Sequence, residues 1–236
     1  MERNNEPVAV TTFFGRDQAA GYDERWAKLA PINDALHLFM RAVLQGLPAD
    51  ARILCVGVGT GAELFALAKI FPGWRFTAVD PAEAMLDICR QKARDAGISD
   101  RCTFHAGYLD SLPRGEAFDA ATAILVSQFL VDHVQRRDFF RQIAQRVRPA
   151  GLLVNADLAS SVQASDYDSL VSVWARTQGV TAPEAVKAMC AAWGKHVAVL
   201  PPKEVEAIMI DGGFEQPILF YQALFIHAWY ARAPRG

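Results

Sequence analysis

The segment ILCVGVGTGAE, residues 53–63, decides the fold. It begins as a short apolar run typical of a buried strand, passes through glycines at every second position, and leads into a helical pattern. A strand that turns through glycines into a helix brings bare backbone close to a ligand at the helix N-terminus. The segment therefore predicts a ligand site at the start of an α/β domain.

A second apolar run, residues 76–79, follows about 20 residues later and ends on Asp80. An acidic side chain at this distance suits a bidentate hold on ribose hydroxyls. Together the two segments predict the first half of a Rossmann-like domain that binds a nucleoside.

Two other interpretations compete with this one. A glycine-rich turn without a ligand would give the same pattern, and residues 57–62 also satisfy the dinucleotide pattern G-x-G-x-x-G/A. Dehydrogenases place this strand near the start of the domain, whereas about fifty largely helical residues precede it here. Two C-terminal strand patterns, 214–221 and 223–232, follow each other without a helix, which also argues against a dehydrogenase.

These stretches resemble class I S-adenosylmethionine-dependent methyltransferases: residues 53–62 resemble their motif I, and VDPAEAML (79–86) resembles their second motif. The resemblance implies a Rossmann-like α/β fold, with a seven-stranded, mostly parallel sheet whose last strand is antiparallel. Helices are expected on both faces, with a helical cap and S-adenosylmethionine as cofactor. The cofactor contacts that it implies are Gly57, Val58, Gly59, Gly61, Asp80, Pro81, Met85, Gly107, Tyr108, Leu109, Ile124 and Tyr22.

The composition predicts one domain over residues 1–236, because 52% hydrophobic and 21% charged residues suit a single sizeable core. Residues 1–47 are expected to form an N-terminal arm and cap helices, with a helix break at Pro31. Residues 157–200 are expected to be a helical insertion that contributes to the cap. Five aromatic residues in these segments look exposed and suit a lid: Phe13, Phe14, Tyr22, Trp174 and Trp193.

The chain departs from the family pattern at two positions. Tyr108 follows Gly107 where the family has an acid, and Asp110 comes two places later, so which group meets the adenine amino nitrogen stays open. Cys55 stands where the family commonly has an acid near the methionyl amine. Glu63 lies on the first turn of the next helix, and we favour a capping or solvated role for it.

His133 is the one candidate for a catalytic base, because it follows the fourth predicted strand and could reach a substrate hydroxyl. A helix cap at Asp132 with a surface histidine is the favoured alternative. The helix that follows carries Arg136, Arg137 and Arg141, which we interpret as a solvated face. No metal-ligand cluster or P-loop is evident.

Charge and composition limit the partners. The net charge of −2 and the pI of about 6.2 make a nucleic-acid acceptor improbable, and no apolar run is long enough for a bilayer. The charged first residues do not look like a signal peptide, and four widely spaced cysteines fit a reducing cytosol. We therefore expect a cytoplasmic enzyme with a small-molecule acceptor, and a homodimer stays open.

The expected reaction is methyl transfer from S-adenosylmethionine to an O, N or S nucleophile of a small molecule. One alternative is an enzyme similar to carboxy-S-adenosylmethionine synthase, which acts for tRNA wobble uridine modification; residues 127–130, 174–179 and 212–215 resemble its pattern. Residues 185–193 offer Lys187 but no arginine for the extra carboxylate, which disfavours it. The other alternative is a non-catalytic, cofactor-binding regulatory protein.

Overall fold

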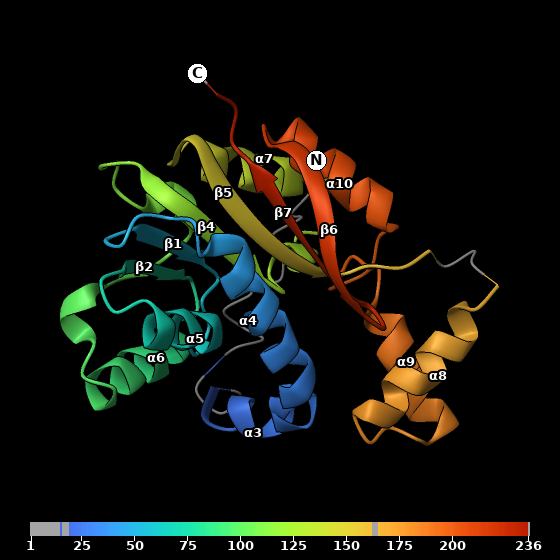
Figure 1. Ribbon diagram of the computed structural model, residues 1–236. Coiled ribbons are helices and arrows are strands. Elements are labelled where there is room, and N and C mark those ends of the chain that lie inside the picture. The colour runs from blue at the N-terminus through green and yellow to red at the C-terminus, as the bar shows by residue number, and fades with distance from the viewer. Residues whose placement is uncertain (1–14, 16–18, 162–164, 236) are drawn as a thin grey trace, which may run out of the picture.

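A seven-stranded sheet forms the centre of the computed structural model, which describes residues 15, 19–161 and 165–235 (Figure 1). The strand order is β3-β2-β1-β4-β5-β7-β6, and β7 is antiparallel to both of its neighbours, whereas the other pairs are parallel. This confirms the predicted fold class. The strands are β1 (Arg52–Val56), β2 (Arg75–Asp80), β3 (Cys102–Ala106), β4 (Phe118–Ile124), β5 (Val147–Leu158), β6 (Glu215–Ala223) and β7 (Ile226–Arg232).

Helices cover both faces of the sheet and extend beyond one end of it (Figure 1). The α-helices are α3 (Tyr22–Trp26), α4 (Ala30–Leu44), α5 (Ala62–Ile70), α6 (Glu83–Asp95), α7 (His133–Ala144), α8 (Tyr167–Thr177), α9 (Pro183–Ala192) and α10 (Pro202–Asp211). Short 3₁₀ turns are η1 (Ala27–Leu29), η2 (Ser99–Arg101), η3 (Leu109–Ser111) and η4 (Ser127–Phe129).

Two apolar cores lie on opposite faces because successive strand residues point to opposite sides. Ile53 and Cys55 of β1 belong to the core beneath α4, α5 and α6. Leu54 and Val56 belong to the core beneath α7 and α10. A strand buried on both sides must be apolar throughout, which explains the unbroken hydrophobic run before the glycines.

The N-terminal helical stretch is interrupted near Pro31, as predicted: the 3₁₀ turn η1 separates α3 from α4. Pro31 occupies the first turn of α4, where its missing N–H has no helical partner to lose. The predicted arm lies largely outside the described residues, and so do Phe13 and Phe14.

The predicted insertion contains α8 and α9, which pack around a third apolar cluster with Val171, Trp174, Phe225 and Ile226 at its centre. Trp174 is therefore buried, at 3% exposure, and the expectation that it is exposed is wrong. None of the helices in the described part of the chain combines the length and the hydrophobicity needed to cross a bilayer.

Candidate active site

The glycine turn after β1 has a conformation that side chains do not tolerate. Gly57 has φ of +65°, and a Cβ there would lie 2.5 Å from a methyl carbon of Val126. Its N–H donates to the carbonyl of Val79 at 2.7 Å, which ties the turn to β2. The turn thus presents backbone to the space beyond the carboxyl ends of the strands, where open α/β sheets bind ligands.

Gly61 serves the turn in a different way from Gly57. It has φ of +90° and precedes α5, and a Cβ there would lie 2.7 Å from the sulfur of Cys89. Gly61 is not on the wall of the cavity described below, and its contact with a ligand stays a prediction.

Asp80 ends β2 with its carboxylate next to the glycine turn. Oδ2 accepts a hydrogen bond from the N–H of Gly59 and Oδ1 from the N–H of Ala82, both at 2.8 Å. Burial raises its pKa, and these two backbone N–H groups oppose that rise. A carboxylate has about four acceptor positions, so roughly two remain for a ligand in the cavity.

A cavity of about 540 Å³ opens at this edge of the sheet, a volume within the range of small-molecule sites. The strand ends, the glycine turn, α3, the first half of α4 and the loop after β4 line it. Eleven of the twelve predicted cofactor contacts are on its wall: Gly57, Val58, Gly59, Asp80, Pro81, Met85, Gly107, Tyr108, Leu109, Ile124 and Tyr22. Asp110 is not on this wall, whereas Tyr108 is.

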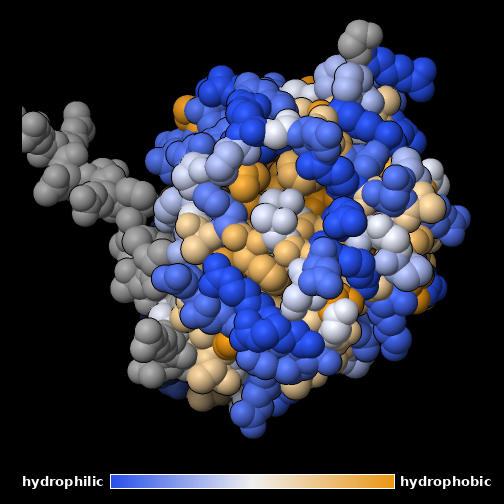
Figure 2. Space-filling view, turned by 90° about the vertical axis from the view of Figure 1, so that its left-hand side faces the viewer, coloured by the Kyte–Doolittle hydropathy of each residue, from blue (hydrophilic) through white to orange (hydrophobic). Residues whose placement is uncertain are grey.

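Much of the cavity wall is apolar. Trp26, Leu29, Leu158 and Trp174 come from the two segments predicted to form the cap, and further apolar residues on the wall are Leu125, Phe129, Leu130, Phe139 and Ile226. On the face seen in Figure 2, hydrophobic residues gather in a central hollow inside a hydrophilic rim. Such an apolar compartment excludes water from a ligand, and a few polar groups then fix its orientation.

Helix α3 is held over the glycine turn by Asp23. Its Oδ1 accepts a hydrogen bond from the Thr60 hydroxyl at 2.7 Å, and its Oδ2 pairs with Lys92 of α6 at 2.5 Å. The next residue back, Tyr22, lines the cavity, and burial raises the pKa of its phenol to about 12. Its hydroxyl therefore stays protonated and can donate to a ligand.

Glu63 is not solvated, which corrects that part of the expectation from the sequence. It lines the cavity and is only 5% exposed. Burial raises the pKa of its carboxyl to about 8, Asp80 adds to the rise, and backbone N–H groups of Glu63 and Leu64 oppose it. Cys55 is fully buried beneath it and supplies no charge, because burial raises its thiol pKa well above normal.

His133 is not in the cavity, so it is not a candidate base for chemistry there. It is half exposed and its Nε2 lies 3.4 Å from Glu204 Oε1. Asp132 caps α7 by accepting from the N–H of Gln135 at 2.9 Å. The alternative of a cap with a surface histidine was the correct interpretation.

His37 of α4 lines the cavity instead, and the sequence interpretation missed it. Burial lowers the pKa of its imidazole, with Asp34 opposing, so the ring is neutral near pH 7 and can accept a proton. Ala30, Asn33 and Asp34 line the cavity as well, at the three- and four-residue spacing of one helix face. The spacing of these residues in the sequence could have indicated a helix face that lines a site. The hydrophobic residues of the same helix gave a stronger pattern, and the helix was interpreted from them alone.

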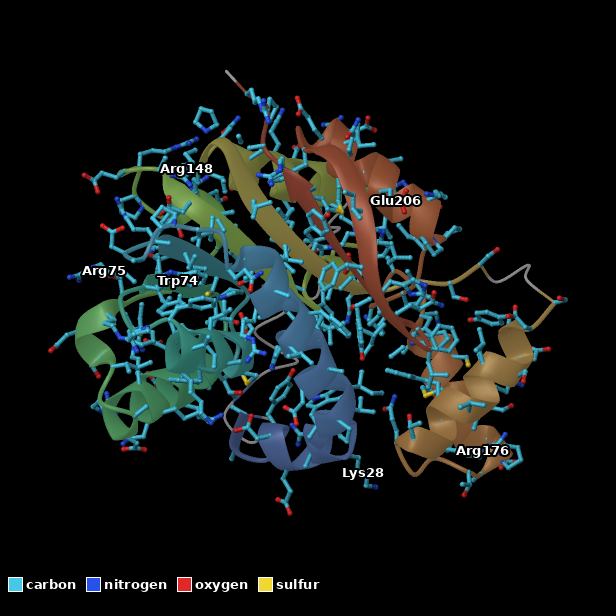
Figure 3. All side chains as sticks on the ribbon, viewed as in Figure 1. Lys28, Trp74, Arg75, Arg148, Arg176 and Glu206 are labelled. Carbon is cyan, nitrogen blue, oxygen red and sulfur yellow. The ribbon has the colours of Figure 1, made fainter. Side chains whose placement is uncertain are left out.

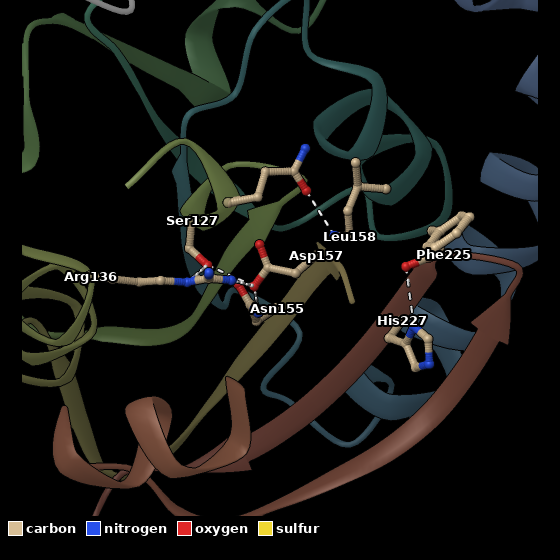
Figure 4. Close-up of polar contacts among 8 residues, drawn as sticks. Ser127, Arg136, Asn155, Asp157, Leu158, Phe225 and His227 are labelled. Carbon is tan, nitrogen blue, oxygen red and sulfur yellow. Dashed lines mark hydrogen bonds and ion pairs between the residues drawn. The ribbon is translucent and has the colours of Figure 1, made fainter. Parts of the chain in front are cut away.

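Arg136 is fully buried, so the solvated face expected for the arginine helix is wrong at this position. Its guanidinium lies 2.9 Å from Asp157 Oδ2, and that oxygen also accepts from Ser127 and Asn155 (Figure 4). The adjoining Gln128 accepts from the N–H of Leu158 at 2.8 Å and lines the cavity. This buried polar cluster therefore fixes the loop after β4 against β5.

Four acidic side chains line the cavity, Asp23, Asp34, Glu63 and Asp80, and no lysine or arginine does so in the described part of the chain. Lys28 and Arg176 lie at the outer edge of the molecule (Figure 3). Arg176 is exposed and donates to the carbonyl of Ser172 within its own helix. Among the described residues, no group of three or more His, Cys, Asp or Glu side chains could hold a metal ion.

Comparisons with known proteins agree with this geometry. Residues 53–151 match the family model described as a methyltransferase domain. The ubiquinone biosynthesis O-methyltransferase of Methylocella silvestris is 32% identical over 142 residues, which cover 56% of this chain and 52% of that protein. The chain thus spans about half the length of this relative.

Solved structures show the same fold at low identity. A magnesium protoporphyrin IX methyltransferase from Synechocystis PCC 6803 with bound S-adenosylhomocysteine has a TM-score of 0.68 at 14% identity, covering 97% of this chain and 100% of that one. The [4+2]-cyclase SpnF has a TM-score of 0.62 at 16% identity, covering 86% and 82%. The domain match and the shared fold support S-adenosylmethionine as the cofactor.

Proposed function

We propose that this chain transfers a methyl group from S-adenosylmethionine to a small-molecule acceptor in the cavity described above. The observation that carries the proposal is Asp80, which is held against the glycine turn with two acceptor positions left over. The methyltransferase-domain match over residues 53–151 supports it independently.

In this proposal Asp80 holds the ribose hydroxyls, and the glycine turn approaches the methionine part of the cofactor. Met85, Tyr108 and Leu109 flank the adenine, and backbone groups of the last two can read its polar edge. Tyr22 contributes from the cap. The apolar wall then receives the acceptor beside the cofactor's methyl group.

The reaction is an in-line displacement. A lone pair of the acceptor forms the new bond to the methyl carbon while the carbon–sulfur bond breaks, and its electrons stay on sulfur as a thioether. Most of the rate enhancement comes from alignment and the exclusion of water. When the nucleophile is a hydroxyl, His37 is the proposed acceptor of its proton, because it is neutral and lines the cavity.

The proposed acceptor is an apolar small molecule without a negative charge. An anionic group would enter a cavity with four acids and no lysine or arginine among its described lining residues. A buried carboxylate without a cationic partner is costly.

The acceptor class can be tested with matched pairs of aromatic alcohols that differ by one carboxylate. We expect the uncharged alcohol of each pair to be methylated with a kcat/KM at least ~10-fold higher than that of the carboxylate. The carboxylate would be buried in the cavity without a cationic partner. Transfer of radiolabelled methyl from S-adenosylmethionine measures this. Faster turnover of the carboxylates would contradict the acceptor class. Tight cofactor binding without turnover of any acceptor would favour a regulatory protein.

We also propose a single domain over residues 1–236, with residues 1–47 and 157–200 as its cap. Segments that open for a substrate are less stable locally than the sheet beneath them. We therefore expect cofactor and acceptor to slow amide exchange in α3 and α8, while β1 and β2 are already protected without ligand. Mass spectrometry after hydrogen exchange measures both. Equal protection of α3 and α8 with and without ligand would make them fixed core.

A further inference from the structure

Glu63 has a buried carboxyl oxygen without a hydrogen-bond partner among the described residues, which the proposed cofactor contacts alone do not explain. Its side chain is 95% removed from solvent and lies on the cavity wall, and its Oε1 has no hydrogen-bond partner among the described residues. A buried acceptor left without a partner costs free energy, so such groups are uncommon without a reason. An incoming ligand group that donates to Oε1 would remove this cost.

The groups that interact with Glu63 indicate that this ligand group carries a positive charge. They are Asp80 of β2, Tyr22 of α3, Cys55 of β1 and Cys89 of α6, and all four are acidic or neutral. Helix α4, which packs on α5, adds Asp34 and His37 to the same cavity wall, and burial lowers the imidazole pKa of His37, so that its ring is neutral near pH 7. Lys92 of α6 is paired with Asp23 of α3. Glu63 thus has no cationic partner from the described chain.

We infer that Glu63 is the counter-charge of the cavity, which pairs with a positively charged group of the ligand and loses its own proton as the ligand binds. The inference rests on the proposed function, since S-adenosylmethionine carries an ammonium and a sulfonium. The proton passes to solvent, so the bound state has one carboxylate and one cation in contact. Because the carboxyl pKa is about 8 in the empty site, Glu63 is mostly protonated at neutral pH before binding.

The sign of the pH dependence follows directly. Below pH 8 the ligand must displace a proton from Glu63, and above pH 8 it need not. Affinity for a ligand with an ammonium group is therefore expected to rise by roughly 25-fold between about pH 6.5 and 8.5. A neutral ligand gains nothing from this ionisation.

Titration calorimetry with two ligands tests the inference. S-adenosylhomocysteine carries an ammonium and a carboxylate, whereas 5′-methylthioadenosine shares its adenosine part and carries neither; only the ammonium can pair with Glu63. Measured at about pH 6.5 in two buffers of different ionisation enthalpy, the first ligand should release close to one proton more than the second. Both ligands contain the ribose, so any proton that Asp80 exchanges on binding it is the same for both. The difference in proton release between the two ligands therefore excludes the contribution of Asp80.

Glu63→Gln should abolish the extra proton release and lower the affinity for S-adenosylhomocysteine by roughly 10-fold at pH 8.5, with methylthioadenosine unchanged. The matched control is Glu83→Gln, an exposed glutamate on the first turn of α6, which should alter neither ligand. Equal proton release for both ligands in the unaltered protein would overturn the inference, even if Glu63→Gln failed to fold. Failure of both ligands to bind would instead overturn the proposed function.

Discussion

Replacing Asp80 with alanine is expected to weaken the binding of S-adenosylhomocysteine by at least ~100-fold. The change removes the proposed acceptors of two ribose hydroxyls, and a hydrogen bond to a charged group contributes about 1.5–3 kcal/mol. It also frees the N–H groups of Gly59 and Ala82, which hold the turn in its binding geometry. Titration calorimetry measures the affinity, and circular dichroism establishes that the variant is folded.

Asp80→Asn separates the two contributions. The amide keeps one acceptor oxygen for the backbone but loses the charge and one acceptor, so an intermediate loss of affinity is expected. Asp110→Ala is the control, because Asp110 is exposed and outside the cavity wall. Unchanged affinity in Asp80→Ala would remove Asp80 from the ligand site.

Replacing Arg136 with methionine is expected to lower the free energy of unfolding by about 3–5 kcal/mol, because it leaves the buried charge of Asp157 without its partner. Ser127 and Asn155 would still donate to that carboxylate, but two neutral donors do not replace a cation. Denaturant unfolding followed by fluorescence measures the change. Arg137→Met is the matched control one residue along, where a 41% exposed side chain pairs with Asp138, and it should cost less than ~1 kcal/mol.

The double variant Arg136→Met with Asp157→Leu tests whether charge is the cause. Removing both partners leaves no buried ion, so part of the lost stability should return. A double variant that is less stable than Arg136→Met alone would contradict this prediction. The loss of stability would then come from disturbed packing and not from an unpaired charge.

The sheet and its ligand edge could be predicted because their signals are local. Gly57 needs a conformation that glycine tolerates, and Asp80 follows an apolar strand at the expected distance, so both positions are visible in the sequence. Burial of a polar side chain is not local. Glu63 and Arg136 look like ordinary surface residues of amphipathic helices, and the groups that surround them come from distant segments.

The positions of His133 and His37 could not be predicted for the same reason, because they depend on contacts with distant segments. His133 lies just after a strand whose carboxyl end faces the site, but Asp132 starts α7 there, and the side chain points to Glu204. His37 precedes the sheet in sequence and reaches the cavity only because α4 packs on α5 and β6, through contacts that no nearby residue pattern encodes.

The position of β7 has a consequence for synthesis on the ribosome. This strand is made after the other six strands of the sheet but lies between β5 and β6, where Asn155 of β5 is paired with Trp229 of β7. Until β7 emerges, one side of β5 has no partner, and an apolar strand with free backbone groups readily pairs with another chain. The nascent chain therefore exposes this unpaired strand edge until β7 has been made.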